Sequence, residues 1–304
     1  MAKIVCVGLA CLDYLFKIHT LPRGGGKFFA QKYVATPGGP AASASLAVSS
    51  LGHEAIFLGR LGDDTIGDEV IRRLEDRGVN AGMSRRIKNQ TSQVSSVVVD
   101  DMGERQVVNF SSSQIDPDPA WLPEEVIANG DFVLTDVRWP EGAARALKIA
   151  REHGVPSLID ADIAPVDISH LVKLAQYSVF SERGLEMVTG LRDPERGLQQ
   201  AEKNSGSCVA VTMGEKGCFW LEKGKMGYCP AEPIKAVDTC GAGDVFHGAF
   251  SVGMVEKMGF KGAMRFASAA AALKCMTFGG SMGAPERKTV DKLLAKPKEI
   301  KGIK

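Results

Sequence analysis

The sequence alternates short apolar runs with amphipathic or alanine-rich segments of helical length, and this alternation limits the possible folds more than any other feature. The apolar runs suit buried strands, and the segments between them suit helices. The predicted strands are residues 4–7, 55–58, 132–135, 157–159, 178–180 and 208–212. The predicted helices are residues 41–50, 65–77, 141–153, 168–175, 194–204, 242–257 and 261–276. Repeated crossover units of this kind predict an α/β fold, a doubly wound, mainly parallel sheet flanked by helices.

Two stretches interrupt the alternation, at residues 14–34 and 94–110. In the second stretch, β-prone runs flank the turn-like sequence Asp100-Asp101-Met102-Gly103-Glu104, a pattern typical of a hairpin. Strands inserted into a doubly wound domain can form a small β-sheet lid, and lids commonly exclude water from an active site. We therefore expect a single domain over residues 1–304 with a lid inserted in these two stretches. A surface hairpin without a role is the alternative.

The segment Asp238-Thr239-Cys240-Gly241-Ala242-Gly243-Asp244 carries the strongest chemical signal. Small residues at Gly241, Ala242 and Gly243 let the backbone approach a ligand closely, and a helix beginning there would direct N–H groups at an anion. Asp244 would lie in the first turn, where it could accept a proton from an attacking hydroxyl. A helix cap and a tight turn would explain the same residues without catalysis.

Together with three further motifs, this segment resembles the signature of the ribokinase-like (PfkB) carbohydrate kinases. Gly38-Gly39-Pro40-Ala41-Ala42 resembles the family's substrate loop, and Gly59-Arg60-Leu61-Gly62-Asp63-Asp64 follows it in the family's order. Thr212-Met213-Gly214-Glu215-Lys216-Gly217 resembles the family's nucleotide loop. The resemblance runs from Gly8 to about Pro285. It implies a ribokinase-like fold and a kinase that uses ATP and Mg²⁺ to phosphorylate a sugar hydroxyl.

The resemblance also implies a role for individual residues. The catalytic group would be the base Asp244 with an anion hole made by Gly241, Ala242 and Gly243. The residues that hold sugar hydroxyls would be Asp13 and Gly39, and those that line the nucleotide site would be Thr212, Gly214 and Gly217. Asp238, with the Cys240 backbone, would help to hold a monovalent cation such as K⁺.

Two positions depart from the family pattern. Ser43, in the substrate loop, stands where the family usually has Asn, which removes an amide and indicates a different substrate set. The family's magnesium-associated Asn-x-x-Glu motif aligns with Ser181-Glu182-Arg183-Gly184, where neither end survives. Mg²⁺ should still be needed, because it neutralises the transferred phosphoryl group, but the protein groups that organise it stay open.

The larger pattern resembles one branch of the family, the 6-deoxy-6-sulfofructose kinases, which also lack Asn-x-x-Glu. The resemblance implies that Gly26, Lys27, Asn109 and Arg138 hold the sulfonate and that the C1 hydroxyl of the ketohexose is phosphorylated. Arg138 follows an apolar strand, where loops at the carboxyl edge of a parallel sheet ordinarily face ligand. Solvated surface charge is the plain alternative for Lys27 and Arg138.

Other functions stay open at this point. A phosphofructokinase or a tagatose-6-phosphate kinase would also need a cationic clamp for its substrate. A ribokinase or ketohexokinase would accept a neutral sugar and give Arg138 and Lys27 nothing to pair with. Outside catalysis, a sugar- or nucleotide-binding regulator would fit the loss of Asn-x-x-Glu, although the retained Asp244 argues against it.

Charge and cysteine content exclude several classes of partner. The formal net charge is +1, without a basic stripe, which argues against nucleic acid. No apolar run approaches the roughly 18 residues of a membrane span. The 7 cysteines form no Cys-x-x-Cys pair and suit reduced thiols in a cytoplasm. Lids of this family often pair between subunits, so we expect a homodimer in which Phe28, Phe29, Val97 and Val99 are exposed apolar contacts.

Overall fold

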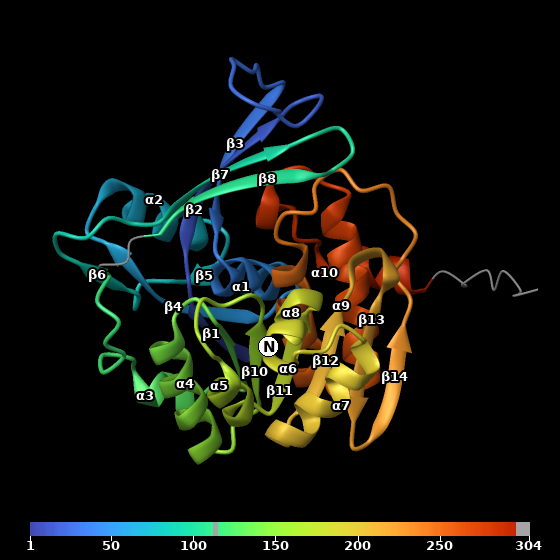
Figure 1. The fold of residues 1–304 in the computed structure, drawn as a ribbon. Coiled ribbons are helices and arrows are strands. Elements are labelled where there is room, and N and C mark those ends of the chain that lie inside the picture. Colours follow the sequence, from blue (N-terminus) through green and yellow to red (C-terminus); the bar gives the residue numbers. More distant parts are fainter. Residues whose placement is uncertain (112–114, 296–304) are drawn as a thin grey trace, which may run out of the picture.

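A 10-stranded, mainly parallel sheet runs through the centre of the computed structural model, which describes residues 1–111 and 115–295 (Figure 1). The parallel strands are β1 (Lys3–Gly8), β4 (Glu54–Gly62), β5 (Val79–Asn80), β6 (Arg85–Ile87), β9 (Phe132–Asp136), β10 (Ser157–Ala161), β11 (Tyr177–Ser181) and β12 (Cys208–Thr212). The antiparallel hairpin β13 (Cys218–Glu222) and β14 (Lys225–Cys229) extends one edge. The strand order is β14-β13-β12-β11-β10-β9-β1-β4-β5, with β6 against β4.

This strand order reverses direction at β1. The chain runs from β1 to β4 on one side and then returns to β9 on the other side, from which it continues outward to β12. Ligands of doubly wound folds bind at such a switch point, in the crevice beyond the carboxyl ends of the strands. The topology therefore places the candidate site where β1 and β9 end.

Helices cover both faces of the sheet. One face carries α1 (Pro40–Ser50), α2 (Thr65–Glu75), α8 (Ala242–Val255), α9 (Gly259–Cys275) and α10 (Arg287–Leu294). The other carries α3 (Glu124–Ala128), α4 (Pro140–Glu152), α5 (Ser169–Leu174), α6 (Glu182–Thr189) and α7 (Pro194–Ser205). Small residues bring α1 and α8 close together, since a Cβ at Gly248 would lie 2.5 Å from the Ala44 carbonyl oxygen.

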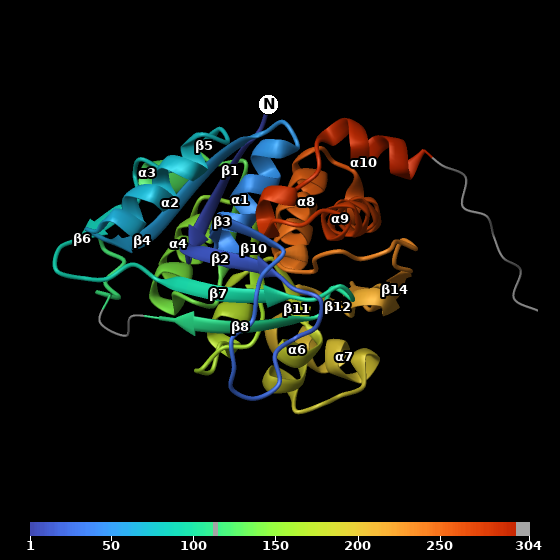
Figure 2. The same cartoon turned by 90° about the horizontal axis from the view of Figure 1, so that it is seen from above.

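A second sheet of four strands lies across the carboxyl edge of the first, between α8 and α9 on one side and α6 and α7 on the other (Figure 2). Its order is β3 (Lys32–Gly38), β2 (Cys11–Lys17), β7 (Val94–Val99) and β8 (Arg105–Phe110). We call it the lid sheet. Its inner face packs Leu15, Val97 and Val99 against Cys240 and Phe278.

The predicted α/β architecture with a separate small sheet is confirmed. The prediction that Val97 and Val99 are exposed is wrong, because their exposures are 1% and 0%. Alternate residues of a strand point to opposite faces, and both valines fall on the inner face with Leu15. Phe28 and Phe29 are exposed as expected. The helices of the described residues include none with the length and apolar character needed to cross a membrane.

Candidate active site

Asp244 lies in the first turn of α8, directly behind the small-residue loop. Gly241 is the N-cap and has a left-handed backbone with φ of 77°, which glycine adopts without steric cost. The N-terminus of a helix presents backbone N–H groups and a partial positive charge to an anion. Among the described residues, a Cβ at Gly243 would meet no atom within 4 Å, so open space lies in front of the loop.

The surroundings of Asp244 adjust its pKa toward neutrality. Burial, and after it the negative charge of Asp160, raise the pKa of this carboxyl to about 7. The charge of His247 and a hydrogen bond from Ser43 act in the opposite direction. A general base works best when its pKa lies near the working pH. The geometry and the pKa of Asp244 both suit proton abstraction.

Asp136 holds the switch point together. This carboxylate is fully buried and accepts the backbone N–H groups of Leu9 (2.8 Å), Ala41 (3.0 Å) and Arg138 (2.8 Å). Burial raises its pKa to about 6. A Cβ at Gly8 would lie 2.1 Å from Asp136 Oδ2, so the strand β1 must end in glycine there. Asp136 thus fixes the end of β1, the start of α1 and the loop after β9.

Asp160 and His247 form a buried pair beside Asp244. Asp160 lies opposite Asp136 in the β9–β10 register, and its Oδ2 is 3.1 Å from His247 Nδ1. Burial opposes protonation of His247, but the charge of Asp160, its hydrogen bond and the charge of Asp244 together outweigh burial and raise the histidine pKa. No role was predicted for Asp136, Asp160 or His247. The sequence does contain a signal for the two aspartates, because two neighbouring predicted strands are each followed directly by an aspartate at the carboxyl edge.

Two of the residues predicted to bind the substrate, Asp13 and Asn109, lie in a row with Ser95 on the inner face of the lid sheet. Asp13 of β2 is opposite Ser95 of β7, and Ser95 is opposite Asn109 of β8. Burial raises the pKa of Asp13, whereas hydrogen bonds from Cys11 and Ser95 act to lower it. Cys11 Sγ is 3.2 Å from Asp13 Oδ1. Residues directly opposite one another share a face, so the row presents hydroxyl, carboxylate and amide groups to the cleft.

Neighbouring atoms lie so close to Gly38 and Gly39 of the substrate loop that neither position has room for a side chain. A Cβ at Gly38 would lie 2.0 Å from Asp13 Oδ2. Gly39 is the N-cap of α1 with φ of 92°, and a Cβ there would lie 2.5 Å from the Leu9 carbonyl oxygen. Ser43 lies one turn into α1, is 2% exposed and hydrogen-bonds Asp244. The sugar and phosphoryl ends of the predicted site therefore meet at the N-terminus of α1.

The predicted nucleotide residues lie in the loop that joins β12 to β13. Thr212 ends β12, and its hydroxyl donates to the Phe180 carbonyl oxygen at 3.3 Å. Gly214 and Gly217 have φ of 55° and 86°, and the N–H of Met213 donates to the Gly217 carbonyl oxygen at 2.9 Å. The loop is a tight turn at the same edge of the sheet as Asp136 and Asp160.

The lost Asn-x-x-Glu motif has a steric explanation. Ser181 caps α6 by accepting the Gly184 N–H at 3.0 Å. A Cβ at Gly184 would lie 2.1 Å from the Ala161 carbonyl oxygen, which leaves no room for a glutamate. Within residues 1–111 and 115–295, no group of three or more His, Cys, Asp or Glu side chains is arranged to hold a metal ion.

The four residues predicted to hold a sulfonate come from three segments, the β2–β3 loop, β8 and the loop after β9. Gly26 and Lys27 are exposed in the loop between β2 and β3, which projects from the lid sheet away from the α/β domain (Figure 1). Asn109 lies in the row on β8. Arg138 lies in the loop after β9, with its Nη2 3.0 Å from Asp162 Oδ2 and about a third of the side chain exposed.

The place predicted for a monovalent cation does not fit one. Asp238 Oδ1 accepts the Cys240 N–H, and Oδ2 accepts the N–H groups of Gly279 and Gly280. The Asp238 carbonyl oxygen accepts Lys274 Nζ at 2.7 Å, and both side chains are 0% exposed. A lysine ammonium thus lies where the sequence predicted K⁺.

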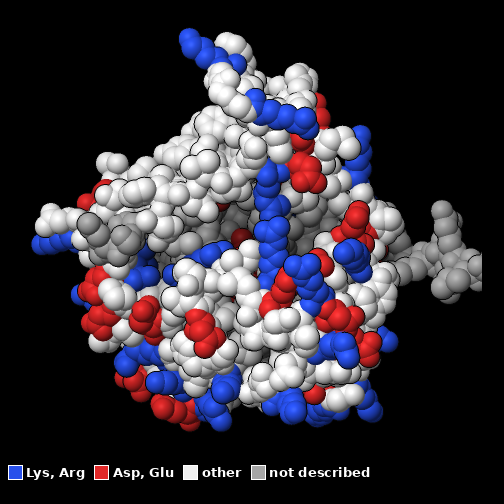
Figure 3. Space-filling view, in the orientation of Figure 1, with Lys and Arg blue, Asp and Glu red and all other residues white. Residues whose placement is uncertain are grey.

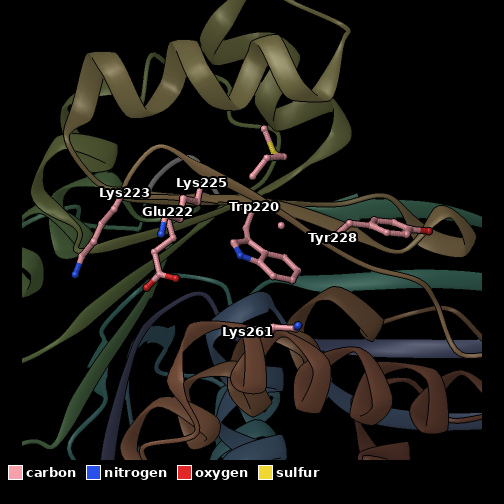
Figure 4. A pocket seen from close by; sticks show the side chains of 8 residues that line it. Trp220, Glu222, Lys223, Lys225, Tyr228 and Lys261 are labelled. Carbon is pink, nitrogen blue, oxygen red and sulfur yellow. The ribbon is translucent and has the colours of Figure 1, made fainter.

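The face that carries these residues is hollowed. Figure 3 shows a recess below the lid sheet, bordered by a column of Lys and Arg side chains and with acidic atoms visible inside it. A different pocket, of about 480 Å³, lies against β14, where the Trp220 indole points toward the helix that carries Lys261 (Figure 4). That pocket includes Glu222, at the end of β13 away from Gly217. Its Tyr228 reaches the nucleotide loop, because the Tyr228 hydroxyl donates to the Lys216 carbonyl oxygen at 3.2 Å. Its lining includes neither Asp244 nor Asp136, so the recess is the better candidate for the chemistry.

Comparison with known proteins identifies the family of this chain. The family model for the pfkB family carbohydrate kinases matches residues 1–287. The ribokinase of Bacillus subtilis (strain 168) is 26% identical over 298 residues, which cover 97% of this chain and 100% of that protein. A deoxyribokinase of Salmonella typhi is 26% identical, over 86% of this chain and 89% of that protein.

Solved structures show the same fold. A protein assigned as a ribokinase in Agrobacterium tumefaciens has a TM-score of 0.93 and 36% identity, covering 97% of this chain and 98% of that one. The Arabidopsis thaliana ribokinase complexed with ribose and ATP has a TM-score of 0.82 and 26% identity, covering 98% of this chain and 100% of that one. The chain therefore belongs to the pfkB family of carbohydrate kinases and is a phosphotransferase with an alcohol group as its acceptor.

Proposed function

We propose that this kinase transfers the γ-phosphoryl group of ATP to the C1 hydroxyl of a ketohexose that carries an anionic group on C6, with 6-deoxy-6-sulfofructose as the substrate. The observation that carries the chemistry is Asp244, a carboxyl of pKa about 7 in the first turn of α8, beside the helix N-terminus. The donor is inferred from the nucleotide-like loop and from the relative that is complexed with ATP.

In the proposed reaction, Asp244 takes the proton of the sugar hydroxyl as that oxygen attacks the γ-phosphorus. Backbone N–H groups of Gly241, Ala242 and Gly243 stabilise the charge on the transferred group. Such preorganised donors commonly contribute the largest single share of the rate. Asp13, Ser95 and Asn109 orient the sugar from the lid sheet, and Mg²⁺ bound to ATP offsets the phosphate charge.

The anionic C6 group is supported by the cationic border of the recess and by the position of Arg138 after β9. Arg138 is partly exposed and can exchange its Asp162 partner for a ligand anion. Lys27 would join it only if the β2–β3 loop folded over the recess on binding. Hydrogen bonds to charged groups are worth roughly 1.5–3 kcal/mol each, so these groups would favour an anionic substituent over a hydroxyl.

A ribokinase is the second candidate, and one observation favours it directly. Asp162 already pairs with the Arg138 guanidinium, so an uncharged sugar would leave no unpaired cation in this loop. Arg138 therefore keeps a partner even when the substrate is neutral. The named relatives are ribokinases and a deoxyribokinase, which points the same way.

A panel of sugars separates these candidates. ATP consumption is measured with 6-deoxy-6-sulfofructose, fructose 6-phosphate, tagatose 6-phosphate, fructose and ribose. We expect the highest kcat/KM for the sulfonated sugar and a rise in its KM of about tenfold or more in Arg138→Ala, because one charge-assisted contact is lost. A highest kcat/KM for ribose, or an equal effect of Arg138→Ala on sulfonated and neutral sugars, would reject the sulfonate proposal.

The outer face of the lid sheet is the surface through which we expect two copies to pair. Tyr33 is 56% exposed, Val108 is 73% exposed and Phe29, in the neighbouring loop, is 89% exposed. Exposed apolar side chains gathered on one sheet face commonly mark an interface. Analytical ultracentrifugation should find a dimer that Val108→Asp converts to a monomer, and a monomeric wild-type protein would reject this interface.

A further inference from the structure

Lys274 is a fully buried lysine at the end of an otherwise apolar helical segment. It is the only charged residue between Phe266 and Cys275, in the last two and a half turns of α9. Its side chain is 0% exposed, as is that of Asp238. Lysine is almost never fully buried unless it is paired, so a specific interaction must retain it.

The partner of Lys274 is Asp238, the first residue of the catalytic segment. Lys274 Nζ donates to the Asp238 carbonyl oxygen at 2.7 Å and lies 3.5 Å from Asp238 Oδ2. Asp238 contributes one negative charge and Lys274 one positive charge, so the buried pair is neutral. An additional cation would unbalance it, and an uncompensated buried charge is strongly destabilising.

Asp238 connects Lys274 to the anion hole. Its Oδ1 accepts the Cys240 N–H at 2.8 Å, next to the N-cap Gly241. Its Oδ2 accepts the N–H groups of Gly279 at 3.0 Å and Gly280 at 2.9 Å. Gly241 in turn packs on Ser281, whose nitrogen would lie 3.3 Å from a Cβ at Gly241.

These contacts form a two-part support beneath the helix N-terminus. One part is the loop that leads into α8, and the other is the loop that follows α9. Asp238 hydrogen-bonds both loops, and the positive charge beside its carboxylate is the ammonium group of Lys274, which belongs to the protein itself. A lysine ammonium and a potassium ion carry the same charge, are similar in size and bind the same carbonyl and carboxylate oxygens.

We propose that the Lys274 ammonium serves as a built-in monovalent cation, which positions the loop from Asp238 to Gly241 and makes phosphoryl transfer independent of added K⁺. Lys274 is a positioning residue, since it acts through Asp238 and lies behind the anion hole. The inference rests on the family's phosphoryl transfer and does not depend on which sugar is accepted.

The first measurement needs no variant and no sugar. Thermal unfolding of the wild-type protein is compared in KCl and in tetramethylammonium chloride at equal ionic strength, because tetramethylammonium is too large for such a site. We expect the same Tm in both salts and, with an active sugar, the same kcat. A Tm that rises specifically with K⁺, or activation of the wild-type enzyme by K⁺, would overturn the proposal.

Variants then test whether the ammonium and the ion are equivalent. Lys274→Ala leaves space for an ion beside Asp238, whereas Lys274→Met fills that space with an uncharged side chain. In tetramethylammonium chloride we expect kcat to fall about 10²-fold in both variants, with little change in the sugar KM, because misplaced anion-hole donors cost this much. K⁺ should restore kcat and raise Tm in Lys274→Ala but not in Lys274→Met.

Lys261→Met is the matched control, because Lys261 is an exposed lysine on the same helix and lines the separate pocket of Figure 4. It should behave as the wild-type protein in both salts. A folded Lys274→Ala that is fully active without K⁺, or that never responds to K⁺, would overturn the proposal. If Lys274→Ala fails to fold in either salt, the wild-type measurement decides alone.

Discussion

Replacing Ser43 with alanine should move the acid limb of the pH–rate profile to higher pH. Ser43 is 2% exposed on α1, and its hydrogen bond to Asp244 lowers the pKa of that carboxyl. A base must be deprotonated to act, so the rate falls as the pH drops through the pKa of Asp244, about 7 in the wild-type enzyme. Loss of a hydrogen bond to the charged form raises the pKa and moves this fall upward.

The size of the shift follows from the energy of one hydrogen bond. A hydrogen bond to a charged group is worth roughly 1.5–3 kcal/mol, and one pKa unit corresponds to about 1.4 kcal/mol. The shift should therefore be about one unit or somewhat more. With a shift of one unit, the ionised fraction of Asp244 at pH 7 falls from about one half to about one tenth, a loss of roughly fivefold in rate. At pH 9.5 the two enzymes should be nearly equal.

The assay is kcat/KM measured between pH 5.5 and pH 9.5, since this quantity reports the pKa values of the free enzyme. Ser45→Ala is the control, because Ser45 is a fully buried serine of the same helix whose hydroxyl donates to the Ala42 carbonyl oxygen at 2.6 Å. Its acid limb should coincide with that of the wild-type enzyme. The reasoning fails if the Ser43→Ala limb does not move, or if its activity is lower by the same factor at every pH.

Three other substitutions test the remaining parts of the site. Asp244→Asn should lower kcat by about 10²–10⁴-fold with little change in the KM for the sugar, and steady-state kinetics showing full activity would exclude it as the base. Gly184→Glu, which restores the acid of the family motif, should lower the Tm and the soluble yield, because its Cβ would lie 2.1 Å from the Ala161 carbonyl oxygen; an unchanged Tm would contradict the steric explanation. Asp136→Ala should reduce the free energy of unfolding in urea by about 3 kcal/mol, because three backbone N–H groups lose a buried acceptor. A loss below about 1 kcal/mol would show that water replaces the carboxylate.

The fold could be predicted because its signals are local. A buried parallel strand such as β9 is a continuous apolar run, and a covering helix such as α4 shows its own period within a dozen residues. The hairpin of β13 and β14, which lies between the nucleotide loop and the catalytic segment in the sequence, was not predicted. Its strands carry polar and glycine residues, as at Lys225 and Gly227, because one of them forms the edge of the sheet.

The catalytic segment could also be located, because its glycines and its acid stand side by side in the sequence. The groups that adjust it could not. Ser43 and Asp160 reach Asp244 from α1 and β10, and only the packing of these elements brings them together; His247 lies in the next turn of α8, but its partner Asp160 is distant in the sequence. Lys274 was predicted only as part of the helix over residues 261–276, since no local pattern distinguishes a buried charge from an exposed one before its partner is known.

The lid sheet is joined to the main sheet at Leu9 and Ala10, between the end of β1 and the start of β2, and it is joined to the helical layer at Gly39, between β3 and α1. Leu9 is fixed on both sides, because its N–H donates to Asp136 and its carbonyl oxygen accepts the Ala42 N–H at 3.3 Å. The turn between β7 and β8 is held at Thr239, whose Oγ1 accepts Arg105 Nη1 at 2.6 Å and donates to the Gly103 carbonyl oxygen at 3.3 Å. We therefore expect the lid to open at this turn and to rotate about its connections at Leu9 and Gly39. Sugar binding and product release would then both require the contacts at Thr239 to break, and the rate at which they break would set an upper limit on turnover.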